Sequence, residues 1–126
     1  KRQSTLVTKQ RVLKELFADA YQKMATWSRQ EELAFLHRIL PRYVDQAMVL
    51  TFGAVTAEKM TDQDRQDLIE AYPQLQLAKE TLAQEAGFVL SFGKVDASYL
   101  YRDLVDAVRE EQSFHMAASI FKEEKN

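Results

Sequence analysis

A chain of 126 residues with 46% apolar residues is long enough to bury one hydrophobic core, and it fits a single domain spanning residues 1–126. Three glycines and two prolines are fewer turn-forming residues than a sandwich or barrel of strands needs. The net charge of −2, from 17 basic and 19 acidic residues, gives no overall attraction to nucleic acid or to an anionic membrane surface.

Cysteine is absent, which excludes disulfides, thiolate metal sites and cysteine nucleophiles. No stretch holds the roughly 18 consecutive apolar residues that cross a bilayer, and the first residues lead into no apolar segment typical of a secretory signal. These features predict a soluble, cytoplasmic protein. The chain begins with lysine rather than methionine, which is compatible with a processed product or a piece of a longer protein.

The N-terminal third has the periodicity of amphipathic helices. Apolar residues recur at i, i+3, i+4 and i+7 over residues 8–25, which predicts a first helix. Ser28 is followed three residues later by glutamate, the spacing of a capping box, so a second helix is expected over residues 29–40. Pro41 disfavours helical backbone at the residue before it, and we expect it to open a third helix over residues 41–52.

A nine-residue stretch occurs twice in the chain. Residues 49–57 (VLTFGAVTA) reappear as residues 89–97 (VLSFGKVDA), with six of nine positions identical. In each copy an apolar helix end is expected, followed by a glycine, Gly53 or Gly93, that takes the left-handed conformation closing a helix. The threonine or aspartate three residues later would cap the next helix. Each copy is therefore predicted to be a joint at which two helices fold back on each other.

The remaining segments are predicted to be helices between these joints. A fourth helix begins at Thr56, with a second capping box at Thr61 as an alternative start, while Pro73 opens a fifth helix and Asp96 a sixth. The predicted fold class is all-α: a single-domain bundle of five to seven helices in antiparallel αα-hairpins. The interval of 40 residues between the two similar stretches also fits a degenerate helical repeat. The sequence leaves open whether the similarity is a true repeat or a chance reuse of similar caps.

No cluster of residues has the composition of a catalytic or metal site. His37 has Glu32 five residues away, a poor spacing for shared ligation, and His115 shares a helix face only with Glu111, which gives two ligands. The acidic residues between positions 62 and 70 alternate with basic and amide residues, as on a solvated helix face. Neither a phosphate-binding glycine motif nor a nucleophile elbow occurs. We therefore expect no catalytic residue, no metal site and no cofactor, and a protein that is not an enzyme.

The first fourteen residues carry five positive and no negative charges. Lys9, Arg11 and Lys14 lie on the predicted first helix, and such an arm could neutralise nucleic-acid phosphates with an affinity that falls as salt rises. A nucleic-acid-associated regulator with a basic N-terminal arm is therefore one alternative function. Another is a helical domain that holds a small apolar ligand, with Met48 and Phe52 lining a cleft between central helices.

A binding surface for another protein is the function that the sequence favours. Tyr99 shares its predicted helix face with two aspartates and is expected to point outward, whereas Leu77 and Phe88 lie off the main apolar seam of their helix. Exposed aromatic and aliphatic residues with a polar surround are frequent anchors of interfaces. The prediction is a non-catalytic helical protein–protein interaction or regulatory module. It would bind a protein partner or itself through these three residues, without membrane contact.

Overall fold

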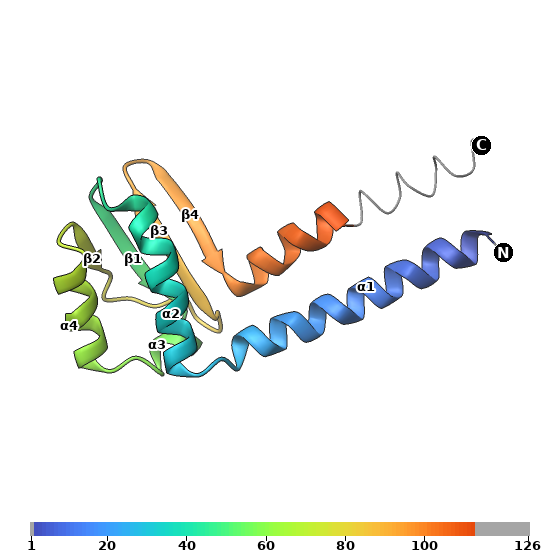
Figure 1. Cartoon of the computed structure of the whole chain (residues 1–126), viewed down its shortest axis with the longest axis horizontal. Helices are drawn as coiled ribbons and strands as arrows, with labels where there is room; N and C mark the ends of the chain where they lie inside the picture. Colours follow the sequence, from blue (N-terminus) through green and yellow to red (C-terminus); the bar gives the residue numbers. More distant parts are fainter. Residues whose placement is uncertain (1, 113–126) are drawn as a thin grey trace.

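The structure is a computed structural model that describes the backbone of residues 2–112 and the side chains of residues 8–112. It combines helices with a four-stranded sheet, so the predicted all-α bundle is wrong (Figure 1). In chain order the elements are α1 (Arg2–Ala25), α2 (Arg29–Ile39), the 3-10 helix η1 (Leu40–Tyr43), β1 (Met48–Phe52), α3 (Ala54–Ala57), α4 (Asp62–Ala71), β2 (Leu75–Leu77), β3 (Gly87–Phe92) and β4 (Val95–Leu100). A further helix, residues 101–112, follows β4 directly.

The strands lie in the order β2-β1-β3-β4. β1 and β2 are parallel, and α3 and α4 form the crossover between them that parallel neighbours require. β3 pairs antiparallel with β1 on one side and with β4 on the other. β3 and β4 form a hairpin in which Phe92 pairs with Val95 beside a two-residue turn.

One face of the sheet forms the core together with α2. Along β1 the buried residues Met48, Leu50 and Phe52 alternate with half-buried ones, as expected where only one face is covered. The buried side chains of α2 include Leu36 and Ile39, which lie about one turn apart, and Figure 1 shows α2 running across this face. Among the described residues, the buried core includes none from α1. This helix and helix 101–112 extend away from the sheet in Figure 1.

The two similar nine-residue stretches contain strands rather than joints between helices. Residues 49–57 begin inside β1 and residues 89–97 inside β3, and these two strands pair with each other, with Leu50 opposite Leu90. An apolar run of about five residues fits a buried helix end or a buried strand equally well. Its β-branched and aromatic residues favour a strand, and the strand forms because a partner strand is available to pair with it.

The glycines of these stretches have different physical roles from the predicted helix ends. Gly53 has a φ of −67°, and a Cβ there would lie 2.3 Å from the carbonyl oxygen of Glu85. Close approach of two backbone segments therefore requires this glycine. Gly93 has a φ of +62° and lies in the β3–β4 turn, where a left-handed residue suits a two-residue hairpin.

Three further predicted elements differ from the structure. The third helix, over residues 41–52, is replaced by η1, a turn and β1, while the segment from Pro73 contains β2, a loop and β3. The last helix begins at Tyr101 rather than Asp96, because residues 95–100 pair with β3. The helical hairpins and the helical repeat are therefore wrong as well. The part of the sixth helix that was expected beyond residue 112 lies outside the described residues.

The helices with clear local signals are confirmed. α1 covers the predicted first helix, and α2 starts with the predicted capping box: Ser28 Oγ accepts from the Glu31 N–H at 3.2 Å, and Glu31 Oε1 accepts from the Ser28 N–H at 3.0 Å. Thr61 and Asp64 form the same reciprocal pair at the start of α4. The alternative start at Thr61 is therefore the observed one for α4, whereas Thr56 lies buried within α3.

Candidate interaction surface

α1 and helix 101–112 form a fork outside the core (Figure 1). Between them lies a groove of about 220 Å³, here named the fork groove. Its lining residues are Lys14, Phe17, Ala18 and Tyr21 from α1 and Arg102, Val105, Asp106 and Arg109 from helix 101–112. A groove between two helices is a frequent place for a ligand or for the helix of a partner.

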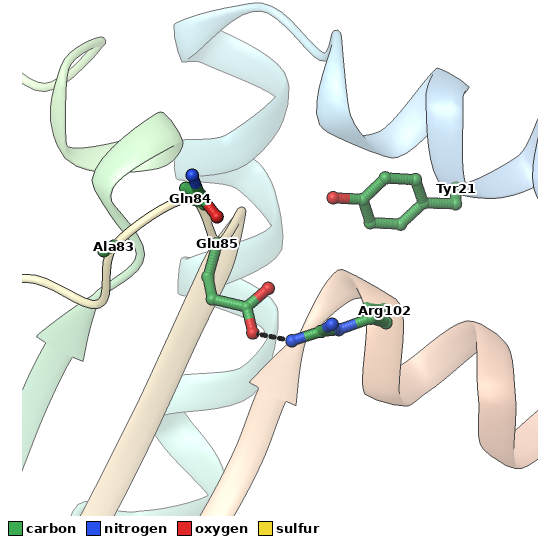
Figure 2. A pocket seen from close by; sticks show the side chains of 5 residues that line it. All are labelled: Tyr21, Ala83, Gln84, Glu85 and Arg102. Carbon is green, nitrogen blue, oxygen red and sulfur yellow. Dashed lines mark hydrogen bonds and ion pairs between the residues drawn. The ribbon is translucent and has the colours of Figure 1, made fainter.

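A second hollow, of about 280 Å³, lies at the base of the fork and is lined by Tyr21, Ala83, Gln84, Glu85 and Arg102 (Figure 2). Tyr21 and Arg102 also line the fork groove, so the two hollows adjoin. The Arg102 guanidinium forms an ion pair with Glu85, and the Tyr21 hydroxyl points toward the same space in Figure 2. The base of the fork is therefore polar, because charged and amide groups surround it.

α1 leaves part of its apolar surface exposed. None of its described side chains, residues 8–25, is buried, and Leu16 and Val12 keep 57% and 49% of their surface exposed. At about 100° per residue, Leu16 lies about 160° around the helix from Lys14 and Ala18, which line the fork groove. α1 therefore has apolar surface on two sides, one within the groove and one facing away from it.

The outer half of the fork groove is basic. Lys14 and Arg109 line it, and Arg11 lies about one turn from Lys14 on α1. Asp106 is the acidic member of the lining, and its carboxylate pairs with Arg109 at 3.1 Å. Among the described residues, no carboxylate forms an ion pair with Arg11 or Lys14. Three positive charges and one negative charge leave a net charge of +2 on these four side chains.

A buried carboxylate lies near the base of the fork. Glu32, in α2, is 1% exposed. Its Oε2 atom accepts hydrogen bonds from Thr56 Oγ1 at 2.6 Å and from Tyr101 Oη at 2.9 Å. Its Oε1 atom accepts no hydrogen bond from the residues that the structure describes, but Lys59 Nζ lies 3.2 Å away as an ion-pair partner. Because an unpaired buried charge is costly, the ammonium of Lys59 is what makes this carboxylate tolerable.

The same cluster reaches the base of each fork helix. Lys59 Nζ donates hydrogen bonds to the carbonyl oxygens of Ala25, the last residue of α1, at 3.1 Å and of Trp27 at 2.8 Å. Tyr101 is the first residue of helix 101–112, and the centroid of its ring lies 5.2 Å from that of Trp27. Burial, and then the charge of Glu32, raise the pKa of Tyr101 well above its usual value, so the phenol stays protonated and donates. We refer to this cluster as the clamp; its members are Glu32, Thr56, Lys59 and Tyr101.

The three residues predicted to contact a partner do not form one surface patch. Phe88 is fully buried in the core, so it is not the exposed anchor that the sequence suggested. Tyr99 points inward rather than outward: its ring stacks on Phe88 with centroids 5.3 Å apart, and its hydroxyl lies 2.5 Å from that of Tyr43. Leu77 is half-buried in β2, at the opposite edge of the sheet from Tyr99 in β4. Strand alternation, which the helical prediction ignored, decides these orientations.

The basic residues proposed for nucleic acid are exposed but do not share one face. Lys9, Arg11 and Lys14 all lie on the exposed surface of α1. At about 100° per residue, Lys9 lies about 140° around the helix from Lys14, so the three side chains form no continuous stripe. Nucleic-acid binding stays a prediction. The cleft predicted between central helices at Met48 and Phe52 is wrong, because both residues lie in β1 and pack in the core.

His37 shows no metal-binding geometry. His37 is exposed, and its Nδ1 lies 2.9 Å from the hydroxyl of Tyr72, which matches a paired surface histidine. His115 lies outside the described residues. Within residues 2–112, no group of three or more His, Cys, Asp or Glu side chains is placed to hold a metal ion. No helix in this same part of the chain has the length and apolar content needed to cross a membrane.

Sequence reasoning missed the clamp, although one signal was present. Glu32 precedes Leu36 by four residues and Ile39 by seven, so it occupies a position on the apolar side of α2. A charged residue at such a position indicates a buried partner. No comparable signal marks Lys59 or Tyr101, because their contacts with Glu32 join segments far apart in the sequence.

The chain matches no protein-family model, no curated protein sequence and no solved structure. Function is therefore inferred from the geometry of the described residues. Three features bear on function: the fork groove, its basic outer half and the apolar surface of α1.

Proposed function

We propose that the protein is a non-catalytic protein-interaction module that binds a helix of a partner protein in the fork groove. The observation that carries the proposal is α1, a helix of 24 residues with no buried side chain among those described. Isolated helices are marginal in water, and helices in proteins gain most of their stability from packing one apolar face. A partner helix in the groove would cover the groove side of α1, which includes Phe17, whereas Leu16 and Val12 lie on the side that faces away.

The charges of the groove suit a partner helix that carries carboxylates beside its apolar residues. Lys14 and Arg109 line the outer half, Arg11 lies about one turn from Lys14 on α1, and Asp106 is already paired with Arg109. Complementary charge across an interface favours encounter and fixes orientation more than it adds affinity. Binding should therefore weaken as the salt concentration rises, mainly through a slower association rate.

Comparative capture from a cell extract tests the proposal. Immobilised wild-type chain is compared with Phe17→Asp and Lys14→Glu, which place an acidic group in the groove, and with Ile69→Asp. Ile69 is a matched control because it is an exposed apolar residue, 40% accessible, on α4. The protein retained by the wild type should be retained by Ile69→Asp and lost by both groove variants. Its isolated binding segment should then bind Lys14→Glu about tenfold more weakly in calorimetry.

Other outcomes of the same experiments would contradict the proposal. Equal capture by the wild type and both groove variants would show that the fork groove is not the binding surface. Light scattering that shows self-association, lost in Phe17→Asp, would identify a second copy of the chain as the occupant instead. Salt-dependent binding of a DNA or RNA duplex, lost when Lys9, Arg11 and Lys14 are neutralised, would favour the nucleic-acid alternative.

A further inference from the structure

The clamp joins the bases of both fork helices through one buried carboxylate. Glu32 Oε2 holds Tyr101, the first residue of helix 101–112, while Glu32 Oε1 pairs with Lys59, whose Nζ holds the carbonyl of Ala25 at the end of α1. We infer that the clamp is a positioning site that sets the angle between α1 and helix 101–112. Its importance for partner binding rests on the proposed function, but the positioning itself does not.

Lys59 makes two hydrogen bonds and one ion pair in this arrangement. Its Nζ donates to the carbonyl oxygens of Ala25 and Trp27, and Glu32 Oε1 lies within ion-pair distance. Two of these three oxygens belong to the backbone at the junction of α1 and α2. The lysine therefore connects the path of the main chain as it leaves α1 to the buried carboxylate of α2.

α1 has few other polar connections to the rest of the molecule. Among the described residues, the hydrogen bond from Lys59 to Ala25 is the one that joins α1 to the sheet and the helices packed on it. The described side chains of α1 are half-buried or exposed, so apolar packing holds this helix less firmly than α2, which has side chains in the core. The direction of α1 therefore depends on the last turn of the helix and on the clamp that holds it.

Stability alone does not account for an ion pair whose carboxylate is buried and whose lysine side chain is 25% exposed. Replacing a buried pair by apolar side chains of similar volume is often neutral or stabilising, because desolvation of two charges offsets their attraction. Hydrogen bonds differ from apolar contacts in requiring specific directions and distances. Glu32 accepts hydrogen bonds from α3 and from helix 101–112 and pairs with Lys59 in the turn after α3, so one arrangement of these segments satisfies all three contacts.

Distance measurements between spin labels test the inference. The chain has no cysteine, so Gln10→Cys and Glu110→Cys provide the two labelling sites, one on each fork helix at an exposed position. The clamp variants are Lys59→Met and the double variant Glu32→Gln/Lys59→Met, which removes both charges together and leaves no unpaired buried charge. Arg29→Met is the matched control, because the Arg29–Asp64 ion pair joins α2 to α4 and contacts neither fork helix.

The distance distribution should be narrow in the unmodified clamp and in Arg29→Met, and at least about twofold broader in both clamp variants. Circular dichroism should show that the sheet and α2 remain folded. An unchanged distribution in the double variant, or equal broadening in Arg29→Met, would overturn the inference.

Capture of the partner separates this inference from the proposed function. Broader distances with unchanged capture would reject the fork groove as the binding surface and keep the positioning role, whereas weaker capture at unchanged distances would reject the positioning role.

Discussion

Tyr101 shows how one buried hydroxyl connects stability to pH. Its phenol is fully buried and donates to Glu32 Oε2 at 2.9 Å. Burial and the charge of Glu32 raise its pKa in the folded state above the ordinary value near 10. A group with a raised folded pKa contributes stability that is present below the unfolded pKa. This contribution is lost as pH rises above that value, because the unfolded chain then releases a proton that the folded chain retains.

The first prediction concerns Tyr101→Phe. At neutral pH the variant should lose about 1–3 kcal/mol of unfolding free energy, because Glu32 loses one hydrogen-bond donor. Above about pH 10, wild-type stability should fall with pH, and the fall should be shallower in Tyr101→Phe, since the group responsible is gone. Urea denaturation from pH 8 to pH 11 measures both effects. The fall should persist in part, because burial also raises the pKa of Tyr72 and of Tyr99.

Tyr21→Phe is the control for this prediction. Tyr21 is only half-buried at the base of the fork and forms no hydrogen bond to another described residue. Its removal should leave the free energy of unfolding at neutral pH close to that of wild type, because no hydrogen bond to a described residue is lost. Identical slopes in wild type and Tyr101→Phe would mean that Tyr101 ionises in the folded protein as it does in the unfolded chain.

At the scale of elements, two glycines show different constraints on the hairpin of β3 and β4. Gly87 has a φ of +109°, and a Cβ there would lie 2.5 Å from the carbonyl oxygen of Tyr99, which is backbone and cannot move aside cheaply. Gly93 has a φ of +62°, but a Cβ there would meet nothing within 4 Å. Gly87 is therefore required both by its positive φ and by the lack of space for a Cβ. Gly93 is required by its positive φ alone.

The second prediction compares alanine at these two positions. Gly87→Ala should cost about 3 kcal/mol or more, because a backbone shift adds to the strain of the left-handed region. Gly93→Ala should cost about 1–2 kcal/mol, and Gly93→Asn less, since asparagine tolerates this conformation. Thermal or urea unfolding of the three variants measures the loss of stability in each and so gives their order. If Gly93→Ala proved the more harmful substitution, the close approach of β3 to the end of β4 would be refuted.

At the scale of the whole molecule, stability should be unevenly distributed between the sheet and the fork. β1 and β3 lie in the middle of the sheet and contribute Leu50, Phe88 and Leu90 to the core, each 0% exposed. α1 contributes no buried side chain among residues 8–25. Segments with few buried contacts open with low free energy, whereas central strands open only with global unfolding.

The third prediction is a gradient of amide hydrogen exchange. In the isolated protein the amides of residues 9–20 should exchange far faster than those of β1 and β3, by about 10²-fold or more if their opening free energies differ by about 3 kcal/mol. Mass spectrometry after timed exchange measures the difference. Addition of the partner should slow exchange in residues 9–20 and leave β1 unchanged. Protection of α1 equal to that of β1 in the isolated protein would contradict an open fork groove.

The sequence by itself determined the elements whose signals are local. α1 and α2 were predicted, and the start of α4 at Thr61 was given as the alternative to Thr56, because helical periodicity and a capping box involve residues within one or two turns of each other. The basic charge of α1 was visible for the same reason. The start of the last helix at Tyr101 was missed by five residues, since the strand preceding it pairs with a segment elsewhere in the chain.

The sheet, the direction of the side chains on it and the clamp depend on contacts between segments that are far apart in the sequence. A run of about five apolar residues such as β1 becomes a strand because β3 and β2 are there to pair with it, which is a non-local condition. The orientation of Tyr99 and Phe88 then follows from strand alternation rather than from a helix face. Glu32 meets Thr56 and Tyr101 across 24 and 69 residues of sequence, and no local pattern encodes contacts at such separations.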